Sequence, residues 1–157
     1  MSTATPTGRM TPKDRRATTV MRHVGPLHIA VLRAFRGRGA WRFRGGDVVL
    51  LTHTGRRSGR QFTVPLLYLR DGEDVLVAAS NGGVDAEPQW WLNLQENPYA
   101  EIEIRGERRA VVAEPVSDSD HAAAWKRFRG IGAMYDKYQA GVARRITLVR
   151  LRPYRAR

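Results

Sequence analysis

The chain has 157 residues, of which 42% are hydrophobic and none is cysteine. A chain of this length can bury one sizeable core, so a single folded domain is expected. The lack of cysteine excludes disulfides, thiolate metal ligands and cysteine nucleophiles, and it fits a cytoplasmic protein. No apolar run approaches the roughly 20 residues that span a bilayer, and the first residues lack the apolar core of a signal peptide, so secretion is not expected.

The formal net charge of +12 is concentrated at one end of the chain. Residues 1–46 contain ten Lys or Arg and one acid, a net charge of +9, whereas residues 47–157 contain 17 and 14, a net charge of +3. Such a basic arm suits nucleic acid, an anionic membrane surface or a polyanionic small ligand. Residues 1–22 are predicted to form a mobile basic tail, and residues 23–157 the folded domain.

An amphipathic helix over residues 26–36 is the first predicted element. Leu27, Val31 and Phe35 recur at every fourth position, which places them on one face of a helix. This face is expected to pack on the domain, with a peripheral membrane contact as the alternative. Residues 36–46 predict a loop in which Trp41 and Phe43 alternate with arginines. Stacking on bases is one interpretation of that loop, but the segment is short and nucleic acid is not the favoured partner.

The centre of the sequence is a predicted β-hairpin over residues 48–68 with a basic, glycine-bounded loop. The loop and the residue before it are Thr54, Gly55, Arg56, Arg57, Ser58, Gly59 and Arg60. Glycine lets the backbone turn tightly and approach a ligand closely. Backbone N–H groups and guanidinium groups together suit phosphate or carboxylate oxygens. The alternative interpretation is an exposed turn with solvated arginines.

The rest of the chain predicts a small antiparallel barrel. Further strands are expected at 74–80, 100–105, 108–114 and 146–151, and helices at 89–96 and 119–129, followed by a second helical piece with Tyr135 and Tyr138. Tight turns between strands make the sheet mainly antiparallel, and about six strands close into a barrel with flanking helices. The histidines show no metal-binding spacing, so no metal site is predicted. Without a nucleophile or a metal, any reaction needs a bound organic cofactor.

Leu50 to Pro98 resembles the deazaflavin-dependent nitroreductases, which occur mainly in actinobacteria. The resemblance depends on the combined order TGRxSG, PLxY, DG, SxGG, PxW and NLxxNP, because no single piece of it is specific. It implies a single-domain split β-barrel that uses coenzyme F-420 to reduce a quinone, an enone or a nitroaromatic acceptor. FMN is the second choice of cofactor, and a non-catalytic coenzyme- or anion-binding module is the other alternative. The oligomeric state is not predicted.

The resemblance also implies roles for individual residues. The loop from Thr54 to Arg60 would hold the phosphate and the anionic tail of the cofactor. The residues implied around the deazaflavin ring are Pro65, Leu66, Asn81, Gly82, Gly83, Trp90 and Asn93. Many relatives carry basic residues where this chain has Phe62 and Asn81, which would weaken the hold on the tail.

The implied catalytic residues are Ser80, Tyr135 and Tyr138, all of them hydroxyl donors. The two tyrosines are spaced i, i+3 and can therefore face one pocket from a helix. Trp90 and Trp91 are adjacent, so only one of them, Trp90, is expected to face inward as a cofactor wall. Core packing is the alternative for the tyrosines and for Trp90, and a simple turn residue is the alternative for Ser80.

Overall fold

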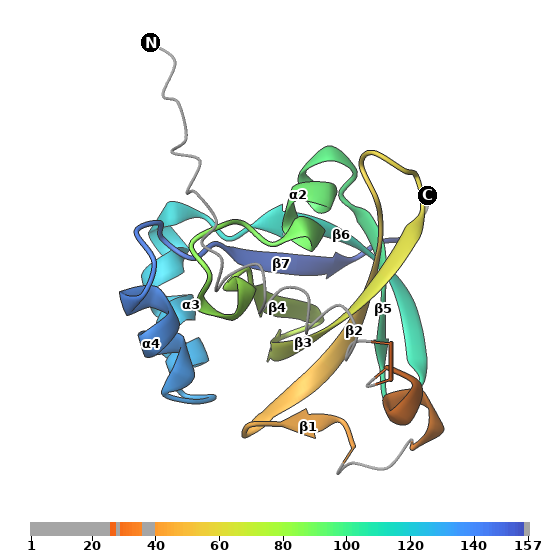
Figure 1. Ribbon diagram of the computed structural model, residues 1–157, viewed down its shortest axis with the longest axis horizontal. Coiled ribbons are helices and arrows are strands. Elements are labelled where there is room, and N and C mark those ends of the chain that lie inside the picture. The colour runs from red at the N-terminus through yellow and green to blue at the C-terminus, as the bar shows by residue number, and fades with distance from the viewer. Residues whose placement is uncertain (1–25, 28, 36–39, 156–157) are drawn as a thin grey trace.

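The computed structural model describes residues 26–27, 29–35 and 40–155 (Figure 1). The strands are β1 (Arg42–Phe43), β2 (Gly46–Thr54), β3 (Gln61–Asp71), β4 (Asp74–Ala78), β5 (Tyr99–Ile104), β6 (Glu107–Pro115) and β7 (Leu148–Pro153). The helices are α2 (Gln89–Glu96), α3 (Asp118–Arg129) and α4 (Met134–Ala140), with a 3-10 turn η1 (Asn81–Gly83) and an N-terminal helical segment before β1. None of the helices in these ranges is long and apolar enough to cross a bilayer. The predicted tail, residues 1–22, lies outside the described residues.

Six antiparallel strands close into a barrel in the order β2-β3-β4-β7-β6-β5. Closure comes from β2, whose residues Leu50 to Thr52 pair with β3 on one side and with β5 on the other. The connections between β2 and β3 and between β5 and β6 are too short for anything but hairpins. The predicted split barrel with flanking helices is therefore confirmed. The short strand β1 pairs with the start of β2, where the sequence predicted only a loop.

The barrel interior is filled by β-strand residues together with part of α2. The interior strand residues include Val49, Leu51, Tyr68, Val75, Val77, Ile102, Val111, Val149 and Leu151. Trp90 and Trp91 both join this cluster, at 6% and 5% exposure. The prediction that only one of the two tryptophans faces inward is wrong. The barrel and its edge enclose α2 on more than one side, so that neighbouring positions on the helix both meet apolar walls.

The N-terminal helical segment packs through a different face from the predicted one. Leu32 is fully buried and contacts Trp41 and the outer side of β2. Leu27, Val31 and Phe35 are instead 69%, 42% and 63% exposed, so the predicted packing of that face is wrong. The face that is buried carries Leu32 and the partly buried Ile29, which pack against Trp41, Val48 and Leu50. Arg33, next to Leu32, adds a contact to the carboxylate of Glu103 on β5 at 3.2 Å.

Trp41 is also not available for base stacking. Its side chain is 1% exposed, and its indole N–H donates to the carbonyl oxygen of Phe35 at 3.1 Å. Phe43, two residues later, is 50% exposed. Trp41, one of the two aromatic residues that suggested base stacking, thus packs between the helical segment and β2 instead.

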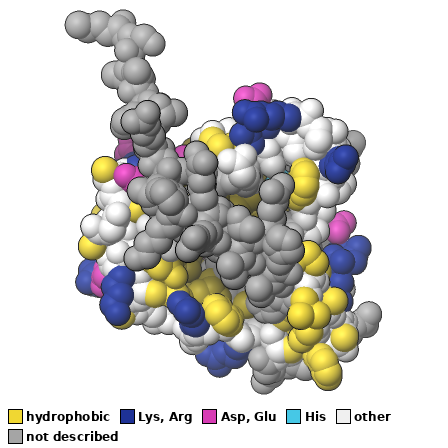
Figure 2. Space-filling model, viewed as in Figure 1, with side chains coloured by type: hydrophobic (Ala, Val, Ile, Leu, Met, Phe, Trp, Pro, Cys, Tyr) yellow, Lys and Arg dark blue, Asp and Glu magenta, His cyan; other side chains and the backbone are white. Residues whose placement is uncertain are grey.

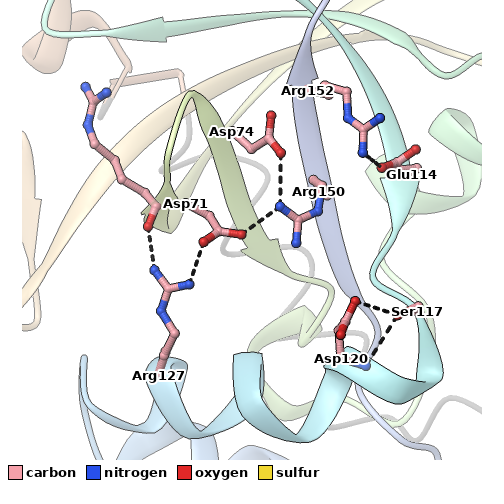
Figure 3. Close-up of polar contacts among 9 residues, drawn as sticks. Asp71, Asp74, Glu114, Ser117, Asp120, Arg127, Arg150 and Arg152 are labelled. Atoms are coloured by element: carbon pink, nitrogen blue, oxygen red, sulfur yellow. Dashed lines mark hydrogen bonds and ion pairs between the residues drawn. The ribbon is translucent and has the colours of Figure 1, made fainter.

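Charged groups hold α3 against the barrel (Figure 3). Arg127 donates to Asp71 at 2.8 Å and to the carbonyl oxygen of Arg70, and Arg150 on β7 donates to Asp71 and Asp74 at 2.7 and 3.0 Å. Hydrogen bonds from Arg150 and then Arg127 lower the pKa of Asp71. At the other end of α3, the Ser117 hydroxyl accepts from the backbone N–H of Asp120 and so caps the helix. These contacts hold α3 beside β4, and α4, which follows α3 in the chain, lies beside η1.

Candidate functional site

The loop between β2 and β3 is a hydrogen-bonded turn. The Gly55 N–H donates to the carbonyl oxygen of Arg60 at 2.7 Å, and the Gly59 N–H donates back to Gly55 at 2.8 Å. A Cβ at residue 55 would lie 2.6 Å from the Phe62 ring and 2.8 Å from the Ser58 hydroxyl, so glycine is needed there. Gly59 has φ +68°, which glycine adopts without strain. The predicted glycine-bounded turn is therefore present.

The arginines of this loop fall into two kinds. Arg56 is tied to α2, because its backbone N–H and its guanidinium donate to the Asn93 side-chain oxygen at 3.1 and 2.8 Å and the guanidinium also donates to Gln89 at 3.1 Å. Arg57 and Arg60 are exposed, and no acceptor for either guanidinium lies among the described residues. The structure thus gives Arg56 a positioning role and leaves Arg57 and Arg60 as the cations that an anionic ligand could reach.

Asn93 connects this loop to the barrel through His53. Both side chains are 5% exposed, and the Asn93 amide nitrogen lies 3.2 Å from Nδ1 of His53. Because the amide oxygen already accepts from Arg56, the amide donates to Nδ1, and the ring proton of a neutral His53 is therefore on Nε2. Burial lowers the pKa of His53 to about 4, so the ring is neutral near pH 7. Phe62 stacks on His53 at a centroid distance of 6.0 Å and covers one side of its ring.

The second predicted loop lies between β4 and α2. Asn81, Gly82 and Gly83 have φ of 50°, 62° and 83°, a left-handed run that asparagine and glycine tolerate best. The Asn81 side chain donates to the carbonyl oxygen of Ala86 at 3.0 Å, which explains an asparagine at this position. Ser80 is half-buried at the start of this turn, and its hydroxyl has no hydrogen-bond partner in the part of the chain that the structure describes.

The two predicted tyrosines lie in different surroundings. Tyr138 is half-buried, and a Cβ at residue 83 would lie 2.7 Å from its ring, so α4 and the second loop meet at a bare glycine. Tyr135 is 4% exposed and packs edge-on against Trp125, Phe128 and Tyr138. Burial raises the pKa of Tyr135, which keeps its hydroxyl protonated. Tyr138 therefore contacts the loop directly, whereas Tyr135 backs it from the core, and the catalytic role of either stays a prediction.

The residues predicted to flank the ring are also divided. Leu66 and Trp90 pack with the barrel interior, and Pro65 lies on the opposite face of β3 from Leu66. Thr54 accepts from the Gln61 side chain at the end of the hairpin.

Two cavities, of about 180 and 460 Å³, lie away from the residues predicted to form the site. The first is lined by Arg33, Trp41 and Glu103, and the second by Gly46, Tyr68 and Arg127 among others. The described residues contain no cluster of metal-ligating side chains.

Comparison with known proteins gives the family. Residues 24–153 match the model of a family described as F420H(2)-dependent quinone reductase. The chain belongs to this family. A putative F420H(2)-dependent quinone reductase of Mycobacterium tuberculosis is 40% identical over 105 residues, which cover 67% of this chain and 88% of that protein. An F420H(2)-dependent quinone reductase of the same organism is 38% identical over 136 residues, which cover 82% of this chain and 91% of that protein. The predicted resemblance is confirmed.

A solved structure agrees with this assignment. The structure of an F420-H2 dependent reductase superposes with a TM-score of 0.61 at 26% identity, covering 66% of this chain and 92% of that one.

The family resemblance and the barrel were predictable from the spacing of short motifs. His53 and Gln89 were not predicted as site residues, because a histidine inside a strand and a glutamine at a helix start carry no distinctive spacing.

The neutral state of His53 predicts a pH dependence of stability. The unfolded chain binds a proton near pH 6.5 but the folded protein only near pH 4, so the free energy of unfolding should fall as the pH is lowered between these values. The loss should be on the order of 3 kcal/mol. Urea denaturation across this range measures it, and His53→Gln, which keeps an acceptor and cannot titrate, should lack this part of the loss. Equal pH slopes in the two proteins would contradict the assignment.

Proposed function

We propose that this protein transfers a hydride from reduced coenzyme F-420 to a quinone. The match of residues 24–153 to the quinone reductase family carries the proposal. Enones and nitroaromatic compounds are conjugated acceptors of the same kind, and they are proposed as further substrates. The family match favours the deazaflavin over FMN, and it favours a reductase over a non-catalytic coenzyme- or anion-binding module.

The residues present fit a cofactor with an anionic tail and a flat ring. Arg57 and Arg60 offer exposed guanidinium groups with no partner among residues 26–27, 29–35 and 40–155, beside a glycine turn, and such groups suit phosphate and carboxylate oxygens. Gly83 leaves the backbone bare beside Tyr138, where a larger residue would clash. The two loops belong to one unit, because the second loop runs directly into α2 and α2 holds Arg56 of the first.

Quinone reduction to the hydroquinone needs a hydride and a proton. A bound reduced deazaflavin supplies the hydride, since the carbon in place of the flavin N5 disfavours single-electron transfer. The chain's own part is to bind the tail through Arg57 and Arg60, to hold ring and acceptor together, and to supply a hydrogen bond or the proton. Ser80 and Tyr138 are the proposed donors. Tyr135, whose pKa is raised by burial, stays protonated and supports Tyr138 from the core.

Stopped-flow mixing tests this proposal. Reduced coenzyme F-420 with the protein should be oxidised on addition of menadione, and the absorbance of the oxidised deazaflavin should return at a rate that depends on protein concentration. A parallel titration with FMN should show weaker binding. Absorbance that stays constant across a panel of quinones, enones and nitroaromatics would remove the proposed activity, and tight binding of FMN alone would replace the cofactor.

The exposed arginine pair predicts a selective loss of cofactor affinity. The double substitution Arg57→Ala with Arg60→Ala should weaken coenzyme F-420 binding at least about tenfold, because each charge-assisted bond contributes about 1.5–3 kcal/mol. Calorimetric titration measures the change. Arg70→Ala with Arg155→Ala removes two other exposed cations and should leave the affinity within about twofold. Wild-type affinity in the first double variant would show that the loop is only a turn.

The proposal includes contact with an anionic membrane surface, where a quinone would dissolve. Leu27, Val31 and Phe35 form an exposed apolar stripe, and hydrophobic side chains gather over this segment at the lower right of the space-filling view (Figure 2). The segment belongs to the part of the chain, residues 1–46, that carries a net charge of +9. An apolar stripe among cations is the pattern of an interfacial helix.

Vesicle sedimentation tests the contact. The protein should sediment with phosphatidylglycerol-containing vesicles and much less with phosphatidylcholine alone, and added salt should release it. Val31→Ser with Phe35→Ser should reduce binding severalfold, since two exposed apolar side chains are lost. Tyr99→Ser, which removes an exposed aromatic ring from β5, is the matched control and should bind like wild type. Equal sedimentation of all three proteins would contradict the proposed contact surface.

A further inference from the structure

A single arginine outside the predicted site organises the second loop. Arg144 lies between α4 and β7, and its Nη2 donates to the carbonyl oxygens of Ala79 and Ala86 at 3.0 and 3.1 Å. The same nitrogen lies 3.5 Å from the carbonyl oxygen of Val84. Residues 79 and 86 lie at the two ends of the loop, so one guanidinium bridges the two ends through hydrogen bonds.

Neighbouring contacts strengthen this closure. The Ala143 N–H donates to the Asp85 carboxylate at 3.2 Å, and the Ala79 N–H donates to the carbonyl oxygen of Thr147 at 2.8 Å. The segment around Arg144 thus holds the loop at its beginning, middle and end. Inside the loop, the Asn81 side chain donates to the carbonyl oxygen of Ala86 at 3.0 Å and the Gly83 N–H donates to the carbonyl oxygen of Ser80 at 2.9 Å. These bonds shape the turn itself, and the segment around Arg144 adds the support from outside that holds it against the barrel.

The ion pair of Arg144 does not explain its position. Its Nη1 lies 3.5 Å from Oε2 of Glu87, and that oxygen, Nη1 and Nε are all buried without a hydrogen-bond partner in the described part of the chain. A buried guanidinium with incomplete pairing is costly. A hydrophobic residue would fill the space at lower cost, but it could not donate to several carbonyl oxygens at once. The backbone contacts are therefore the function that requires an arginine here.

We propose that Arg144 is a positioning residue for the cofactor loop: by binding the carbonyl oxygens at both ends of the loop, it sets the path of Ser80 to Gly83 against Tyr138. This inference rests on the proposed function for the identity of the ligand. The effect of Arg144 on the shape of the loop does not need the ligand and can be measured without it.

Hydrogen–deuterium exchange of the ligand-free protein tests the structural part. In Arg144→Ala, amides of residues 80–87 should exchange at least about tenfold faster, while amides of β2 to β7 keep their wild-type protection. Arg145→Ala is the matched control, because this neighbouring arginine is exposed and pairs with Asp118 rather than with the loop. Unchanged exchange in the loop would overturn the proposal, and so would a uniform rise across the barrel, which would make Arg144 a residue of the fold alone.

Cofactor titration tests the functional part. Arg144→Ala should weaken coenzyme F-420 binding at least about tenfold, because a charged donor to several carbonyl oxygens is lost. Arg144→Lys, which restores the charge but not the planar fork, should recover only part of the affinity. Arg145→Ala should bind like wild type. Equal affinity in Arg144→Ala and wild type would overturn the proposal, whereas a wild-type protein that binds no coenzyme F-420 would overturn the proposed function and leave the exchange experiment as the test of the loop.

Discussion

The double pairing of β2 is the constraint on which the rest of the structure depends. Leu50 to Thr52 bond to β3 and β5 at once, so the sheet curls into a barrel instead of ending in two open edges. Closure fixes the interior that α2 fills with two tryptophans, and the end of the same strand starts the arginine loop. The position of the candidate site therefore follows from the same strand that closes the core.

Arginines serve two separate purposes around this site. Arg56 and Arg144 donate to a side-chain amide and to backbone carbonyls, and so hold the two loops in shape. Arg57 and Arg60 remain exposed, and their guanidinium groups have no acceptor in the described part of the chain. The planar guanidinium suits the first purpose because it reaches several acceptors in fixed directions. The basic character of the loop thus overstates the number of cations that a ligand can meet.

The sequence predicted what depends on local chemistry. The bounds of α2 and the hairpin turn around residues 55–59 were predicted from turn residues and spacing, and they agree with the structure. The predictions that were wrong concern which face of a helix packs against its neighbours. Leu32 replaces the predicted stripe because Trp41 and the outer side of β2 offer it an apolar surface, with Arg33 contacting Glu103 beside it. Likewise Trp91 is buried beside Trp90 because α2 is enclosed, which no periodicity within eight residues can reveal.

The tyrosines show how packing divides a motif that the sequence presents as a pair. Both lie on α4, but Tyr135 is buried against Trp125 and Phe128 of α3, which the ion pairs of Arg127 and Arg150 with Asp71 help to hold beside the barrel. Tyr138 lies one helical turn further, where its ring faces Gly83. A residue with a side chain at position 83 would push α4 away and separate the hydroxyl from the loop. The absence of a side chain at Gly83 is therefore as much a part of the candidate site as the tyrosine that faces it.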